Sequence, residues 1–249
     1  MQSTMKQAGD GPIDDAELAR RSVIGFGEVV AALGRGYTGP EAEVRWPNAL
    51  GARIGVAADN PWFDAAVVPV GELPPADDIL LPGCLWTLAD AVPGRLEEPS
   101  IATPCMGVML DDPALLALGN GAQTVDTPSL RLLGDLNERA YGETGGFTPL
   151  VSALQDERIR AYGLKDNGSF VCVALTLTVG DDLSIHYVAT EADYRRRGLA
   201  SQLVLSLLAK ARGEGLKTAT LQASEEGLPV WERLGFRQVA TLRGYLRPA

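Results

Sequence analysis

Residues 194–200 read Y-R-R-R-G-L-A and separate an apolar run that ends at Thr190 from an amphipathic pattern that begins at Gly198. At the start of a helix, successive backbone N–H groups can face one point, where the helix dipole is positive. Gly198 lets the backbone approach an anion closely, Ala200 keeps the first turn thin, and three arginines add positive charge. The stretch therefore predicts a loop that holds a diphosphate. A basic surface turn before a helix is the alternative interpretation.

The residues on both sides of this loop show a regular order of helical and strand patterns. Thr127 and Pro128 are the expected N-cap and first-turn residues of a helix. We expect helices at 128–141, 148–154, 198–212 and 228–234, and strands at 158–164, 169–179, 183–190, 218–223 and 237–242. This order predicts an α/β fold of the mixed α+β kind in one compact unit.

The first half of the chain has a different texture. A helical period covers 14–34, and short apolar runs separated by Pro- and Gly-rich turns follow it. We expect strand-like segments at 53–58, 65–70 and 106–110, and either a strand or a helix at 81–92. Glycines near 119–121 mark the expected boundary. The sequence thus predicts a small α+β lobe over 13–120 and a second domain over 121–249.

Composition limits the partners. The formal net charge of −10 argues against nucleic acid and anionic membranes, which need clustered Lys and Arg. No apolar run approaches the roughly 20 residues of a membrane span, and the N-terminus lacks the apolar core of a signal peptide. Three scattered cysteines fit a reducing compartment. We expect a cytoplasmic protein with no nucleic-acid or membrane partner, and no pattern indicates its oligomeric state.

Two kinds of site are disfavoured. His186 is the only histidine, so a structural zinc site lacks ligands, and any Ser-His-Asp or Cys-His catalysis would have to use it without a G-x-S-x-G elbow. Residues 34–39 match the dinucleotide pattern G-x-G-x-x-G, but they follow a helical pattern and are closed by Pro40. We interpret them as a helix end, and we expect neither a metal nor NAD.

The diphosphate loop resembles the R/Q-x-x-G-x-G/A loop with which GNAT acetyltransferases bind the pyrophosphate of acetyl-CoA. Residues 187–190 are similar to their splayed fourth strand, whose backbone pairs with the pantetheine arm. The segment 230–236 and the Asn137…Ala140-Tyr141-Gly142 helix end also resemble family segments. The resemblance covers roughly the second half of the chain and implies the GNAT fold.

The resemblance implies an acetyl-CoA-dependent N-acetyltransferase that acts on a primary amine of a small molecule. The residues that it assigns to binding of acetyl-CoA (CoA) are Val188, Thr190, Arg195, Arg196, Arg197, Gly198, Leu199, Ala200 and Ser201. A backbone N–H freed by the splayed strand, at Val188, is the candidate donor to the reaction's oxyanion.

Two features depart from the family pattern. Trp231 stands where many members place a tyrosine that protonates the departing CoA thiolate, and an indole N–H cannot give up its proton near neutral pH. Packing of the helix onto the sheet is the plainer interpretation of Trp231. The 13–120 lobe has no Arg-x-x-Gly-x-Gly/Ala loop, and we interpret it as a degenerate copy of the same fold without a cofactor site.

Strand periodicity places Ser184, His186 and Val188 on one face, which we expect to point toward the pantetheine end. An imidazole with a pKa near ~6.5 suits a general base, and arylalkylamine acetyltransferases of the same superfamily carry histidines on the matching stretch. Two interpretations stay open: a catalytic His186, or a buried imidazole without a role, since a bulge after it would reverse the facing. Weaker candidates for the base are the carboxylates Glu138, Glu143, Glu225 and Glu226.

A function from a different class stays open as well. Without the tyrosine, the chain could be a non-catalytic acyl-CoA-binding module (a pseudo-acetyltransferase) with a regulatory role. Both hypotheses predict CoA binding, and they differ in turnover.

Overall fold

One sheet organises the computed structural model, which describes residues 13–46, 49–54, 61–68, 83–92, 98–119, 125–142 and 145–247. Its ten strands within those residues are β1 (Glu43–Trp46), β2 (Ala49–Ala52), β3 (Ala65–Val68), β4 (Cys84–Thr87), β5 (Ile101–Met109), β6 (Ile159–Asp166), β7 (Ser169–Val179), β8 (Asp182–Thr190), β9 (Thr218–Gln222) and β10 (Arg237–Leu246). Across the sheet they follow the order β1-β2-β3-β4-β10-β5-β9-β8-β7-β6. The helices are α1 (Asp15–Tyr37), α2 (Pro113–Ala117), α3 (Leu130–Tyr141), α4 (Phe147–Ser152), α5 (Leu199–Gly213) and α6 (Leu228–Arg233).

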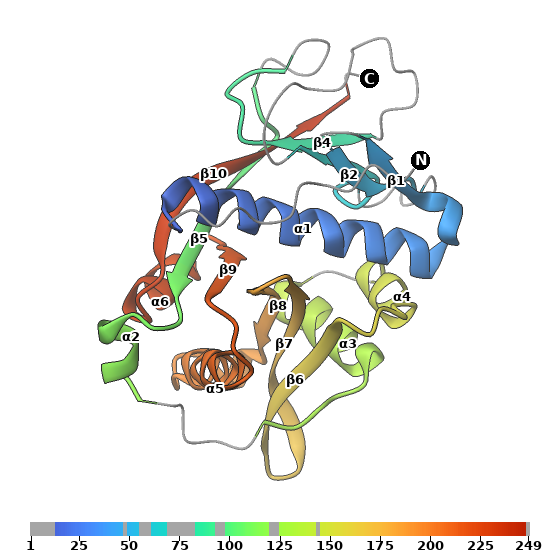
Figure 1. The fold of residues 1–249 in the computed structure, drawn as a ribbon. Coiled ribbons are helices and arrows are strands. Elements are labelled where there is room, and N and C mark those ends of the chain that lie inside the picture. Colours follow the sequence, from blue (N-terminus) through green and yellow to red (C-terminus); the bar gives the residue numbers. More distant parts are fainter. Residues whose placement is uncertain are drawn as a thin grey trace.

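The long helix α1 lies between the two ends of the sheet, with β1 and β2 on one side of it and β6 to β8 on the other (Figure 1). Glu28 of α1 shows how close the two sheet edges come to this helix. It accepts hydrogen bonds from Arg45 of β1 at 3.0 Å and from Arg158, just before β6, at 3.1 Å. Because β1 and β6 are the two edge strands, one carboxylate ties both edges of the sheet to the same helix.

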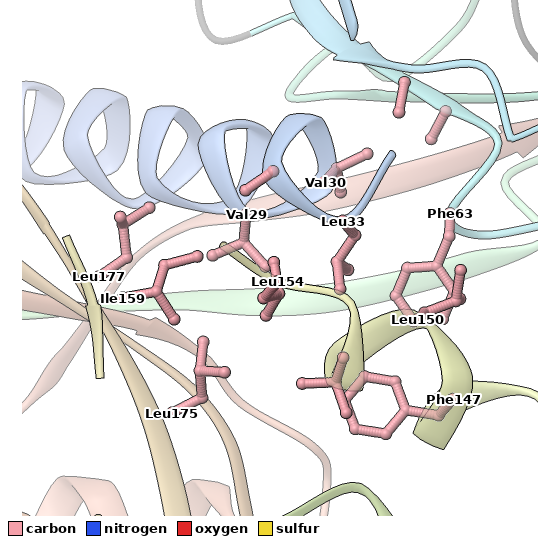
Figure 2. Close-up of a cluster of buried hydrophobic side chains, with 14 of the residues drawn as sticks. Val29, Val30, Leu33, Phe63, Phe147, Leu150, Leu154, Ile159, Leu175 and Leu177 are labelled. Atoms are coloured by element: carbon pink, nitrogen blue, oxygen red, sulfur yellow. The ribbon is translucent and has the colours of Figure 1, made fainter. Parts of the chain in front are cut away.

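The apolar face of α1 forms the main core with helix α4 and strands β6 and β7. Val29, Val30 and Leu33 of α1 are buried, and Figure 2 shows them near Leu150 of α4 and Leu175 of β7. Burial of an aliphatic side chain of this size contributes about 1.5–3 kcal/mol. This packing fixes α1 against the strands that border the site described below.

Close approach of α1 to β8 depends on a glycine. A Cβ atom placed on Gly25 would lie 2.1 Å from the Oγ atom of Ser184, so only the absent side chain lets the helix lie against this strand. The consequence is that Ser184, on β8, faces α1.

Strand β5 joins the two halves of the chain. It lies between β9 and β10 and pairs antiparallel with both, Met106 standing opposite Leu221 on one side and Gln238 on the other. The first half of the chain therefore completes the sheet of the second half. The division into lobes at 13–120 and 121–249 stays a prediction, and the sheet continues across it.

Most predicted elements are confirmed within a few residues, and the segment at 81–92 contains the strand β4. Two details were wrong. Helix α3 is capped by Ser129, whose Oγ accepts from the Leu132 N–H at 3.2 Å, and not by Thr127. Strand β2 precedes the predicted 53–58, of which 55–58 lie outside the described residues. Its small Gly51 packs so tightly on β3 that a Cβ there would lie 1.9 Å from the Ala65 carbonyl oxygen.

Among the residues that the structure describes, none of the helices combines the length and the apolar character that crossing a bilayer requires.

Candidate functional site

The sheet opens beside α5 because β8 and β9 pair over only part of their length. Their parallel register runs from Asp182 opposite Thr218 to Ile185 opposite Leu221, and among the described residues it goes no further. A strand that leaves its neighbour turns backbone donors and acceptors toward a gap instead of toward a ladder. This is the splayed strand that the sequence resemblance implies.

A bulge in β8 lies at the mouth of this gap. His186 stands opposite Leu175 of β7, and the next pair is Ala189 with Val173, so two residues of β8, Tyr187 and Val188, stand opposite the single residue Ala174. Tyr187 has a φ of 50°, in the left-handed region. Bulges of this kind bend a strand and re-aim its side chains.

A pocket of about 500 Å³ occupies the gap between β8, the start of α5 and helix α6. Eight of the nine predicted cofactor-binding residues line it: Val188, Thr190, Arg195, Arg196, Gly198, Leu199, Ala200 and Ser201. The structure thus brings together the residues that the loop and strand patterns selected.

The loop before α5 has the backbone geometry of an anion site. Gly198 is the N-cap of α5 with a φ of 77°, and Arg196 has a φ of 60°. No side chain among the described residues caps this helix end, so its first N–H groups keep their hydrogen-bonding capacity for a ligand. The dipole of a 15-residue helix favours negative charge there. A diphosphate fits this donor set.

The three arginines of the loop differ in their contacts. Arg195 donates through Nε to the Thr190 carbonyl oxygen at 3.3 Å and through Nη2 to the Ala140 carbonyl oxygen, so it ties the loop to β8 and α3. Arg196 lines the pocket. Arg197 does not, because its guanidinium donates to the Asp193 carbonyl oxygen at 2.6 Å and lies over the Tyr194 ring. Of the predicted cofactor residues, only Arg197 is absent from the pocket lining.

A second pocket, of about 230 Å³, adjoins the first. The two share the lining residues Tyr141, Val188, Ser224 and Trp231. The other residues around the second pocket are Phe26, Thr103, Ile185, His186, Tyr187, Leu221, Gln222 and Ala223. Among the described residues, its lining is largely apolar and aromatic and contains no carboxylate. Phe26 comes from α1 and Thr103 from β5, so the first half of the chain contributes to this pocket.

His186 lines the second pocket, but its surroundings are too apolar to favour the protonated imidazole that a general base must form. Its Nε2 atom lies 2.8 Å from the Ser184 Oγ, and burial lowers the pKa of the imidazole to about 3. The ring is therefore neutral near pH 7 and takes up a proton only weakly. The assignment of His186 as general base stays a prediction, and this environment makes it a weak base.

The expected common face of Ser184, His186 and Val188 was wrong. Ser184 and His186 lie on the α1 side of the sheet, whereas Val188 packs with the cluster that contains Leu203 and Leu207 of α5. The bulge at Tyr187 is the physical reason, because one extra residue moves the following side chain to the opposite face.

The C-terminal end of α3 is bonded to the bulge. Asn137 donates through Nδ2 to the Tyr187 carbonyl oxygen at 3.1 Å, and the Tyr141 hydroxyl donates to the Val188 carbonyl oxygen at 3.2 Å. Gly142, with a φ of 72°, ends the helix directly after Tyr141. This helix end resembles a family segment in the sequence, but the resemblance gave Tyr141 no chemical role.

The weaker carboxylate candidates have other surroundings. Glu138 accepts from the backbone N–H groups of Phe147 and Thr148 at 2.8 and 2.7 Å, so it caps α4. Glu226 lines the larger pocket, Glu225 is exposed, and Glu143 lies outside the described residues. Of the three described carboxylates, Glu138, Glu225 and Glu226, none lines the second pocket.

Trp231 is buried and lines both pockets. It packs in the apolar cluster that joins α5, α6 and the sheet. The predicted packing role is confirmed by this contact set, and Trp231 borders both pockets as well.

Comparison with known proteins identifies the class. Residues 130–236 match the model of the Acetyltransferase (GNAT) family. A curated relative, the [ribosomal protein bS18]-alanine N-acetyltransferase of Escherichia coli K12, is 26% identical over 129 residues, which are 51% of this chain and 86% of that protein.

Solved structures extend the likeness of the fold to the first half of the chain. A GCN5-related N-acetyltransferase from Kribbella flavida is 15% identical with a TM-score of 0.59, covering 93% of this chain and 96% of that one. A GNAT-family protein from Novosphingobium aromaticivorans is 16% identical with a TM-score of 0.56, covering 87% and 95%.

The fold, with its splayed strands and helix-start anion site, is shared with solved GNAT-family structures. Residues 130–236 match the GNAT acetyltransferase family, and this match, together with the named relative, supports acyltransferase activity.

Proposed function

We propose that the protein is an acetyl-CoA-dependent N-acetyltransferase, with the cofactor in the larger pocket and a primary amine of a small molecule in the smaller one. The observation that carries this proposal is the junction of the two pockets at the β8 bulge, where both reach Val188. Two substrates that meet at a bulged, splayed strand have their reacting atoms beside backbone donors.

The residues around the larger pocket suit the parts of acetyl-CoA. The helix start at Gly198 and the side chain of Arg196 would hold the diphosphate, and the backbone around Thr190 would pair with the pantetheine arm. The cofactor supplies an activated acyl group as a thioester. The chain's part is to place it so that a backbone N–H at Val188 faces the acyl oxygen.

The smaller pocket supports the acceptor class. Its volume of about 230 Å³ suits a group of side-chain size, and its lining offers aromatic faces without a carboxylate to hold an ammonium ion. An amine that enters such a site is favoured in its neutral, nucleophilic form, because an apolar wall disfavours the charged form.

A protein acceptor is the second candidate, because the Escherichia coli relative is named as an alanine N-acetyltransferase of ribosomal protein bS18. The two acceptor classes differ in what lies beyond the amine. A protein N-terminus needs a groove for the following residues, whereas a small amine needs only the pocket.

We propose that the 13–120 lobe has kept the architecture of the fold without a second cofactor site. Supporting this, β5 completes the sheet and α1 supplies Phe26 to the second pocket. The proposal includes the cytoplasmic location that the sequence indicates and a stoichiometry of one CoA per chain.

The test is calorimetric titration with CoA, followed by measurement of free thiol released from acetyl-CoA with a panel of amines, amino acids and alanine-terminated peptides. We expect one CoA per chain and amine-dependent thiol release that is faster with small amines. Binding without release by any acceptor would support the non-catalytic acyl-CoA-binding module. Faster release with peptides would transfer the assignment to a protein acceptor.

A further inference from the structure

The proton that the departing thiolate needs has no donor at position 231, because the indole N–H of Trp231 is not acidic near neutral pH. Another proton donor to the thiolate would have to be one of the residues that line both pockets. Tyr141 is the one tyrosine among the four shared lining residues. A phenol, with an ordinary pKa near ~10, is by far the strongest acid in that set.

Tyr141 stands where the two pockets meet. Its hydroxyl donates to the Val188 carbonyl oxygen at 3.2 Å, and Val188 is a bulge residue that lines both pockets. In the proposed arrangement the thioester would lie at this junction, since the cofactor would come from one pocket and the amine from the other. The Tyr141 hydroxyl would then lie on the side of the carbon–sulfur bond that breaks.

The backbone around Tyr141 is held from two sides. Asn137, one turn earlier on α3, donates to the Tyr187 carbonyl oxygen, and Arg195 of the anion loop donates to the Ala140 carbonyl oxygen. The loop that would hold the diphosphate thus also positions the residue that precedes Tyr141. The side chain of Tyr141 is 57% exposed. Desolvation of the part that is covered and the charge of Glu226 raise the pKa of the phenol, whereas the charge of Arg195 lowers it, so the phenol keeps its proton at neutral pH.

We infer that Tyr141 is the general acid that protonates the CoA sulfur, in place of the family tyrosine that Trp231 replaces. This inference rests on the proposed function. As the amine nitrogen bonds to the acyl carbon, the carbon–sulfur bond breaks and the sulfur takes the phenolic proton. The amine's own proton goes to a base or to water, and Tyr141 regains a proton from solvent, so charge and atoms balance.

The first experiment compares Tyr141→Phe with the wild type. We expect kcat to fall about 10²-fold or more, the usual effect of losing a positioned acid, with the Kd for CoA from calorimetry unchanged within about twofold. Tyr245→Phe is the matched control. Its hydroxyl also donates to a backbone carbonyl, that of Ala89 at 3.0 Å, but it lies on β10 and lines neither pocket. We expect this variant to keep the wild-type kcat.

The second experiment tests whether the fall of kcat in Tyr141→Phe comes from the loss of a proton donor. In Tyr141→Phe/Trp231→Tyr a phenol returns at the family position, and we expect kcat to recover at least tenfold relative to Tyr141→Phe. A purely structural loss at Tyr141 would not be repaired from α6.

The third readout needs no turnover. CoA bound to the wild type should ionise to the thiolate at a lower pH than CoA bound to Tyr141→Phe, followed by the ultraviolet absorbance of the thiolate, because the phenol donates to the anion. Equal thiol pKa values together with an unchanged kcat would overturn the inference. Failure of the wild type to bind CoA would instead overturn the proposed function, so the two failures are distinguishable.

Discussion

Among single residues, the buried and neutral His186 makes the free energy of unfolding depend on pH. Burial lowers its pKa from 6.5 to about 3, so below pH 6.5 the unfolded chain binds a proton that the folded chain does not. This difference in proton binding has no effect on the free energy of unfolding above pH 6.5. It lowers the free energy of unfolding increasingly as the pH falls toward 3. We expect the free energy of unfolding of the wild type to fall by about 1.4 kcal/mol per pH unit more steeply than that of His186→Gln between pH 5.5 and 4.5. Denaturant titrations at each pH measure this difference. Parallel curves for the two proteins would show that the imidazole reaches water.

At the scale of the element, the N-terminus of α5 depends on left-handed backbone at Gly198. A Cβ there would meet only the Gln202 side chain, at 3.9 Å, so the cost of a side chain is conformational and not steric. This conformational cost is about 1–2 kcal/mol for a β-branched residue with a φ of 77°, and the loop would distort to relieve it. We expect Gly198→Val to weaken CoA binding about tenfold or more by calorimetry. Gly215, just after α5, has a φ of 86° and open space around it, so Gly215→Val carries the same backbone cost away from the pocket. A similar loss of affinity in both variants would count against the anion loop.

At the scale of the whole molecule, Glu28 joins both edges of the sheet to α1. Burial raises the pKa of its carboxyl, but the guanidinium groups of Arg45 and Arg158 outweigh this and lower it. Because Glu28→Gln removes the charge that both arginines face, we expect the free energy of unfolding to fall by about 1–2 kcal/mol. Asp135→Asn, which breaks an exposed pair with Arg131 on α3, should change it by less than about 0.5 kcal/mol. Chemical denaturation measures the free energy of unfolding of both variants. Equal changes in the two would show that the contact of Glu28 with both sheet edges stabilises the fold no more than an exposed ion pair does.

Local sequence patterns were sufficient to predict the anion loop and the elements around it. An N–H cradle at a helix start is local, because Gly198, the residues that follow it and the preceding strand lie within a few residues of one another. Turn residues and the 3.6 and 2.0 periodicities are local in the same way, and for that reason α1, α3 and β6 to β10 could be predicted.

How distant parts of the chain meet could not be predicted from such local patterns and required the three-dimensional structure. Phe26 and Tyr141 line the same pocket from α1 and α3. The sequence pattern of either helix gives no information about where the other helix lies. The place of β5 between β9 and β10 is likewise a matter of long-range pairing. The facing of Val188 depended on a bulge, because one inserted residue reverses every later side chain and leaves no mark in composition or periodicity. The protonation state of His186 followed from its burial, which is a property of the packed core and not of the strand that carries it.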